Sequence, residues 1–221
     1  MNGSSQRQRP RVCLKDWLSW HNKYNNPNSQ LAGRLRTVQI QIRAILDDSP
    51  SGPLSVIVLC AGQGQDLLEV LVDHPRRDDV RARLVELDER NAEVAEEKAR
   101  ASGLRHVQVI TGDASLADQY LGIAPAHLVL ICGVFGNIID DDIRFTIDSC
   151  SQLCRTGGAV IWTRNRRAPD RVPLICEWFK QRGFDLRWLS EQDSVFGVGV
   201  HRFTRETQPL IAGMRMFTFV G

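Results

Sequence analysis

A chain of 221 residues with 43% hydrophobic and 24% charged residues has the composition of an ordinary globular protein, and it is long enough for one domain with a full core. A formal net charge of +2 argues against a dedicated nucleic-acid-binding domain, which is usually strongly basic. No run of about 18 apolar residues occurs, so the sequence predicts no membrane span. Residues 1–12 contain no apolar stretch, so we expect no secretory signal and a cytoplasmic location.

The six cysteines are scattered and form no C-x-x-C pair. The sequence therefore predicts neither a zinc ribbon nor a thiol redox centre, and we expect no metal site. Unpaired cysteines in this number fit a reducing compartment.

The first part of the chain differs in pattern from the rest. Residues 1–12 are polar and are predicted to form a disordered tail. Residues 13–53 are predicted to form a helical cap or lid, because apolar residues follow one another at helical spacings of four, three, four and three between residues 31 and 45. The Pro- and Gly-rich run at 49–53 ends this segment, and the main domain is expected to cover residues 54–221.

Strand-like and helical segments alternate from residue 54 onward. Strands are predicted at 54–60, 83–87, 107–111, 127–132, 159–163, 184–189 and 196–203, and helices at 66–72, 91–101, 140–154 and 173–182. This order predicts an α/β fold: a doubly wound, mostly parallel, seven-stranded sheet that ends in an antiparallel hairpin. Residues 214–220 are predicted to be a further edge strand or a tail that docks on the domain. In such sheets ligands bind at the carboxyl ends of the strands.

Three polar features follow successive predicted strands. Gly62 and Gly64 lie between the first strand and a helix, where they let backbone N–H groups approach a ligand. Glu86 ends the second strand, where an acid can accept hydrogen bonds from both ribose hydroxyls. Asp113 follows the third strand, where its carboxylate is able to accept from an adenine amino group. Together they predict a nucleoside site at one edge of the sheet.

Four segments, VIVLCAGQGQDLLEVL, LVELDERNAEVAEEKARASGL, VITGDASL and LCRTGGAVIW, resemble in this order those of the class I S-adenosylmethionine-dependent methyltransferases, over roughly residues 54–203. The chain also resembles a group of small bacterial proteins of this class with a W-x-x-W-H-x-x-Y opening and a C-G-V-F-G-N segment. The resemblance implies a Rossmann-like fold, S-adenosyl-L-methionine as the cofactor and methyltransferase activity. The cofactor-binding residues that it implies are Tyr24, Cys60, Ala61, Gly62, Gln63, Gly64, Glu86, Leu87, Asp113, Ala114, Cys132, Gly133 and Val134. Asp66 is added to them as a hypothesis from its position.

Two positions depart from the family pattern. Cys60 stands where the family usually has an acid, and Asp66 stands where it often has a third glycine. A cysteine cannot bind the cofactor's ammonium group as a carboxylate does. Asp66 lies at the predicted helix start and is the hypothetical replacement.

Aromatic and polar residues precede the main domain. Trp20, His21 and Tyr24 are interpreted as a lid, in which Trp20 binds substrate, His21 takes a catalytic role and Tyr24 lies near the methionine end of the cofactor. Alternatively, Trp17 and Trp20 pack on the sheet as core residues. Arg34 is expected on the solvated face of the following helix.

Further candidates follow the later strands. Phe135 is expected to line the acceptor pocket, and Asn137 is a candidate for orienting an amine or hydroxyl. Arg164 leaves the fifth strand at the same edge and is a candidate for holding an anionic substrate. His201 is a candidate base, although a single histidine in a strand is also typical of a hydrogen-bonded structural group.

These patterns favour a methyltransferase acting on the oxygen or nitrogen of a small molecule rather than on RNA or protein. One alternative is an NAD(P)-dependent oxidoreductase, but Leu67 stands where the dinucleotide fingerprint requires glycine or alanine. The other is a non-catalytic S-adenosylmethionine-binding protein. The oligomeric state, a homodimer included, stays open.

Overall fold

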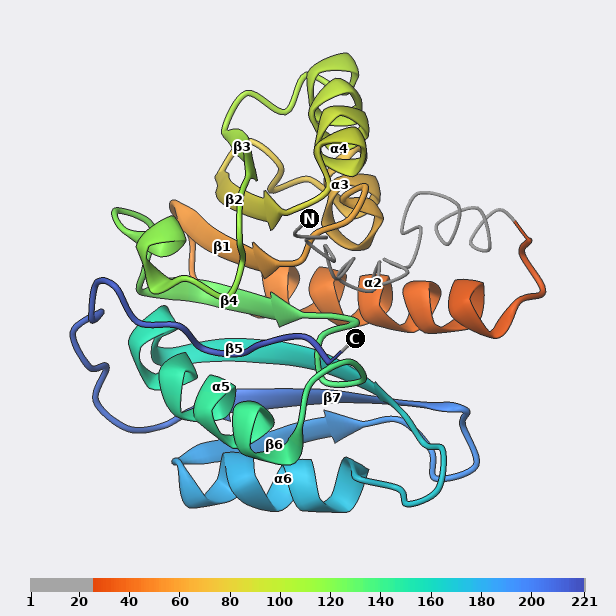
Figure 1. Ribbon diagram of the computed structural model, residues 1–221. Helices are drawn as coiled ribbons and strands as arrows, with labels where there is room; N and C mark the ends of the chain where they lie inside the picture. The colour runs from red at the N-terminus through yellow and green to blue at the C-terminus, as the bar shows by residue number, and fades with distance from the viewer. Residues whose placement is uncertain (1–25, 221) are drawn as a thin grey trace, which may run out of the picture.

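Seven strands form a single sheet in the computed structural model, which describes residues 26–220 (Figure 1). The strands are β1 (Leu54–Leu59), β2 (Val80–Glu86), β3 (Val107–Thr111), β4 (Ala126–Ile131), β5 (Cys154–Asn165), β6 (Phe184–Leu189) and β7 (Phe196–Phe203). Their order across the sheet is β3-β2-β1-β4-β5-β7-β6. Neighbours from β3 to β5 run parallel, and β7 is antiparallel to both β5 and β6. The predicted mostly parallel sheet with a terminal antiparallel hairpin is confirmed.

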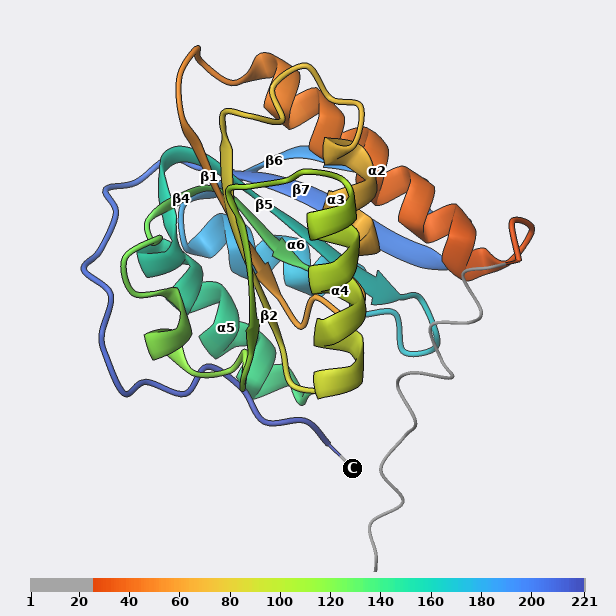
Figure 2. The ribbon, with the colours of Figure 1, turned by 90° about the horizontal axis from the view of Figure 1, so that it is seen from above.

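Helices cover both faces of this sheet (Figure 2). One face carries α2 (Gln30–Asp48), α3 (Gln65–Leu71) and α4 (Glu89–Ala101); the other carries α5 (Asp140–Leu153) and α6 (Val172–Gln181). A short 3-10 helix, η2 (Ala117–Tyr120), precedes β4. Residues from neighbouring positions of β1 enter different core clusters: Ile57 belongs to the cluster that includes residues of α5 and α6, and Val58 to the one that includes residues of α2 and α3. Burial on both faces explains why β1 is apolar apart from Ser55.

Helix α2 begins where Ser29 caps it, since the Ser29 side chain accepts the backbone N–H of Ala32 at 3.1 Å. Its apolar positions Val38, Ile42 and Leu46 are fully buried in the core that also contains β1. Burial of each such side chain stabilises the fold by roughly 1.5–3 kcal/mol. This part of the predicted cap therefore belongs to the helical layer on the sheet.

The segment after β7 runs back over α5 toward the carboxyl end of β4, where the C-terminus lies (Figure 1). Met216 and Phe217 insert into the core on the α5 side, and Leu116 forms one isolated bridge with Arg215. Val220 donates its backbone N–H to the carbonyl of Asn137 at 2.9 Å. Residues 214–220 are thus a docked tail, one of the two predicted alternatives.

Two strands begin several residues earlier than predicted. Strand β2 begins at Val80 rather than at residue 83. The sequence hid this start, because exposed Arg81 and half-buried Arg83 interrupt the apolar pattern of the strand. Strand β5 begins at Cys154 rather than at residue 159, because the glycine-containing stretch after it is extended. Among residues 26–220, no helix has both the length and the apolar character needed to cross a membrane.

Candidate cofactor and acceptor site

A cavity of about 1300 Å³ opens at the carboxyl ends of the central parallel strands. It is lined by the segments that follow β1, β2, β4 and β5, by the start of α2 and by Phe219 of the C-terminal segment. Small-molecule sites usually measure roughly 300–1000 Å³, so this cavity has room for a cofactor and a second molecule. Its position is the one expected for ligands in open α/β sheets.

The turn after β1 has a backbone that few residue types adopt. Gly62 and Gly64 have φ angles of +55° and +72°, and Cys60 has +50°. A Cβ at Gly64 would lie 2.6 Å from Leu68 Cδ1, so this position accepts only glycine without rearrangement. A left-handed conformation costs a non-glycine residue such as Cys60 roughly 1–3 kcal/mol. Burial raises the pKa of the Cys60 thiol well above its usual value, so this residue is neutral.

The carboxylate of Glu86 holds this turn in place. Its Oε2 accepts the backbone N–H of Gly62 at 2.7 Å, and its Oε1 accepts that of Asp88 at 2.9 Å. Only 8% of Glu86 is exposed, and burial raises its pKa while the two backbone N–H groups act in the opposite direction. Each carboxylate oxygen can accept a further hydrogen bond. Glu86 is therefore suited to receive two neighbouring hydroxyl groups.

A buried ion pair lies beside the turn. The Arg34 NH2 group is 3.6 Å from Asp66 Oδ1, and Arg34 NH1 donates to Thr163 Oγ1 at 3.5 Å. Thr163 Oγ1 also accepts the backbone N–H of Gly133 at 2.9 Å. Burial raises the pKa of Asp66, and the Arg34 charge lowers it in part. Arg34 is only 7% exposed, so its expected solvated position is wrong: it faces the cavity rather than bulk water.

Asn91, at the start of α4, is a cavity residue that the sequence analysis did not select. It is fully buried, and its Oδ1 accepts from Gln63 Nε2 at 3.3 Å. Its Nδ2 has no hydrogen-bond partner within residues 26–220. Its place shortly after Glu86, at the start of the next helix, is the signal in the sequence that could have identified it as a cavity residue. Phe219 was also missed, because nothing local relates it to the site.

No protein-family model and no curated protein sequence matches the chain. Among solved structures, 1,6-didemethyltoxoflavin-N1-methyltransferase from Burkholderia thailandensis, with bound 1,6-didemethyltoxoflavin and S-adenosylhomocysteine, matches with a TM-score of 0.61 at 16% identity, over 86% of this chain and 87% of that one. An O-methyltransferase family protein from the same species matches with a TM-score of 0.56 at 16% identity, over 84% of this chain and 63% of that one. A candidate rRNA methylase from Clostridium thermocellum matches with a TM-score of 0.58 at 14% identity, over 75% and 95%.

The chain has the class I methyltransferase fold. At these identities the likeness is one of fold, and the chain spans less than two thirds of the O-methyltransferase family protein.

This methyltransferase fold brings most of the predicted site residues together. The predicted residues that line the cavity are Cys60, Ala61, Gly62, Asp66, Glu86, Leu87, Cys132, Gly133, Asn137 and Arg164. Gln63 adjoins this set through its hydrogen bond to Asn91. Gly64 and Val134 are buried behind the cavity wall.

The predicted adenine-edge residues, Asp113 and Ala114, do not line the cavity. Asp113 Oδ1 accepts from the backbone N–H and the hydroxyl of Ser115 at 2.9 and 2.7 Å. Its Oδ2 accepts from Arg215 of the C-terminal segment at 2.7 Å. A contact between the Asp113 carboxylate and adenine would therefore compete with Arg215.

Phe135 and His201 lie in the core of the methyltransferase fold and not at the cavity. Phe135, expected to line the acceptor pocket, is fully buried with its ring centroid 6.0 Å from that of Trp162. His201 Nδ1 accepts the indole N–H of Trp162 at 3.0 Å, and its ring stacks on Phe179 at 4.4 Å. Burial lowers the pKa of His201 to about 4. The expectations for Phe135 and His201 are corrected accordingly: both are packing residues. His201 is buried because β7 lies between β5 and β6, and Phe135 packs beside Trp162 and Phe179.

The remaining predicted residues, Trp20, His21 and Tyr24, lie outside the described residues. Their assignment to a lid stays a prediction.

Proposed function

We propose that the protein is an S-adenosylmethionine-dependent methyltransferase that methylates an oxygen or nitrogen atom of a small molecule. One observation carries this proposal: the Gly62 turn and the Glu86 carboxylate meet at a large cavity on the carboxyl edge of the parallel strands. That pairing of backbone N–H groups with an acid suits a nucleoside.

The residues present fit this cofactor. Glu86 is able to receive the two ribose hydroxyls, because each of its oxygens holds only one backbone N–H. Asn91 Nδ2 is buried without a hydrogen-bond partner among the described residues, and Asp66 Oδ1 has the Arg34 guanidinium at 3.6 Å but no hydrogen bond; both residues line the cavity. A buried polar atom without a partner costs about 1–3 kcal/mol, so a ligand that supplies partners is stabilised. Asp66 thus remains our candidate for the ammonium group, in place of Cys60.

When bound, S-adenosylmethionine would supply an electrophilic methyl group, with Glu86 holding its ribose and Asp66 its ammonium group. The protein contributes positioning and exclusion of water, which account for much of the rate of methyl transfer. Asn137 donates its side-chain N–H to the Gly133 carbonyl at 2.6 Å. This bond fixes the amide and leaves its oxygen to orient an O–H or N–H of the acceptor.

A small acceptor is supported by the modest net charge of +2. The N-methyltransferase of the same fold was solved with a small molecule, 1,6-didemethyltoxoflavin. The candidate rRNA methylase makes RNA the alternative acceptor that the assay must include. A cytoplasmic location is part of the same proposal.

The test has two stages. Calorimetric titration should give saturable binding of S-adenosylhomocysteine and none of NADH; the reverse result would favour the oxidoreductase. Incubation with S-adenosylmethionine and a panel of amines, phenols and RNA should then release S-adenosylhomocysteine with a small acceptor. Cofactor binding with no turnover across the panel would favour a non-catalytic binding protein.

A further inference from the structure

We propose that the acceptor carries a carboxylate or phosphate group, which Arg164 and Arg167 bind at the β5 side of the cavity. This inference rests on the proposed methyltransferase function and specifies its substrate class.

Most charged side chains that line the cavity are already engaged with one another. Arg34 pairs with Asp66 at 3.6 Å, and Arg90 pairs with Asp88 at 2.7 Å. Glu86 holds two backbone N–H groups. The two remaining cations of the described lining, Arg164 and Arg167, form no ion pair with any described residue.

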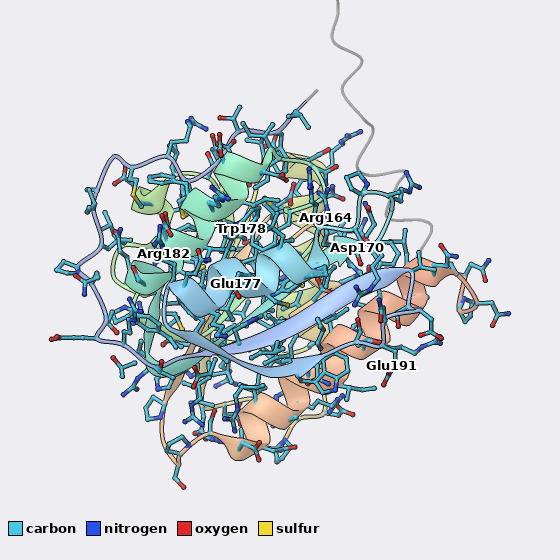
Figure 3. All side chains as sticks on the ribbon, turned by 90° about the horizontal axis from the view of Figure 1, so that it is seen from below. Arg164, Asp170, Glu177, Trp178, Arg182 and Glu191 are labelled. Carbon is cyan, nitrogen blue, oxygen red and sulfur yellow. The ribbon has the colours of Figure 1, made fainter. Side chains whose placement is uncertain are left out.

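Two of the three acids near these arginines are paired with other cations. Asp170 pairs with Arg166 at 2.8 Å, and Asp140 pairs with Arg171 at 3.1 Å. Figure 3 shows Arg164 and Asp170 at the same end of α6, opposite the end that carries Arg182. The third acid, Asp141, lines the same depression as Arg164 and Arg167 and forms no ion pair with any described residue. Two unpaired arginines thus face one unpaired acid, and a net positive charge remains beside the cavity.

Arg164 is held in a position from which it can bind an anion. Its NH1 group donates to the Phe135 carbonyl, which anchors the guanidinium. Its Nε is buried and has no hydrogen-bond partner among residues 26–220. Burial lowers the pKa of Arg164, but an arginine side chain keeps its charge. The half-buried guanidinium therefore carries a positive charge that no carboxylate of the described residues pairs with. A planar guanidinium with free N–H groups matches carboxylate and phosphate oxygens.

Arg167 and Asn165 lie beside Arg164 in the cavity lining. Arg167 is exposed, and its backbone N–H donates to Asn165 Oδ1 at 3.4 Å. Both residues line the cavity, and both also line a second, adjoining depression of about 480 Å³ together with Arg164. An oxyanion at this point would contact one half-buried and one exposed cation.

The position of these arginines separates them from the cofactor end. Glu86 ends β2 and Arg164 lies near the end of β5, with β1 and β4 between them. At a strand spacing of about 4.8 Å, the two ends lie about 14 Å apart along the sheet edge. With the ribose at Glu86, the arginines belong to the acceptor.

The test measures binding to the full chain saturated with S-adenosylhomocysteine. The probes are two matched pairs, 4-hydroxybenzoate with 4-hydroxybenzamide and phenyl phosphate with phenol, which distinguish carboxylate from phosphate. We expect the charged member of at least one pair to bind about tenfold tighter or more, as a charge-assisted hydrogen bond implies. Arg164→Gln and Arg167→Gln should each reduce that preference, and Arg164→Lys should retain part of it.

Arg187→Gln is the matched control, because it removes the same charge from an exposed position that lines neither the cavity nor the adjoining depression. It should leave the preference unchanged, and all variants should bind S-adenosylhomocysteine like the parent. Equal binding of charged and neutral members, no binding of either at millimolar concentration, or a preference that survives both Gln substitutions overturns the inference. If Arg164→Gln does not fold, exposed Arg167 carries the test. Failure of the parent to bind S-adenosylhomocysteine defeats the proposed function instead.

Discussion

His201 should make the folded protein sensitive to acid while contributing little to catalysis. It is fully buried, and burial lowers its pKa from 6.5 to about 4. Between these values the unfolded chain takes up a proton that the folded protein refuses, so the free energy of unfolding falls as the pH falls. Above the unfolded pKa the residue is neutral in both states and this loss is absent.

The size of the effect follows from the two pKa values. One pKa unit corresponds to about 1.4 kcal/mol, so the full window amounts to about 3 kcal/mol. From about pH 7 to about pH 5 the part due to His201 is about 2 kcal/mol. His201→Asn places an amide oxygen near Nδ1, where it can accept the Trp162 indole N–H without titrating. The variant should therefore lose about 2 kcal/mol less than the parent over this interval.

Urea denaturation at a series of pH values measures this difference, and His106→Asn, at an exposed position, is the control. Equal losses in the parent and in His201→Asn would refute the reasoning. Turnover gives a second readout, because removal of a general base costs roughly 10²–10⁴ in rate. We expect kcat/KM to stay within about tenfold; a larger loss in a folded variant would restore the catalytic role.

Three further results are expected. Glu86→Gln should weaken S-adenosylhomocysteine binding by about tenfold or more in calorimetry, because the side chain loses one hydrogen-bond acceptor. Asp113→Asn should weaken binding less, since Arg215 already pairs with the Asp113 carboxylate. A larger effect of Asp113→Asn would contradict the geometry. Gly64→Ala should lower the midpoint of thermal unfolding by more than Gly52→Ala, because both have positive φ but only Gly64 has a close neighbour at the Cβ position; equal shifts would count against it. Asp66→Asn should weaken cofactor binding by about tenfold, and unchanged affinity would remove its role with the ammonium group.

The sheet and the cofactor side of the cavity were predictable from local patterns. Strands β1 and β4 are buried on both faces, so apolar runs with a single polar residue each, Ser55 and His127, marked them within a residue of their observed bounds. Because parallel strands end at one edge, Gly62 and Glu86 had to lie close together once the strand order was known.

The remaining features depend on contacts that no local pattern encodes. The partner of Asp113, Arg215, is 102 residues further along the chain. Arg34 lies four residues before Val38 and shares the buried face of α2, but its ion-pair partner, Asp66, comes from another helix. His201 is buried because β7 lies between β5 and β6 rather than at the edge of the sheet, which strand prediction alone does not reveal.

A crystal structure of the protein with S-adenosylhomocysteine tests the central claim most directly. We predict that both ribose hydroxyls lie within hydrogen-bond distance of the Glu86 carboxylate, and that the sulfur faces the Asn137 and Arg164 side of the cavity. A nucleoside bound elsewhere, or one in this cavity that makes no contact with Glu86, would contradict the account.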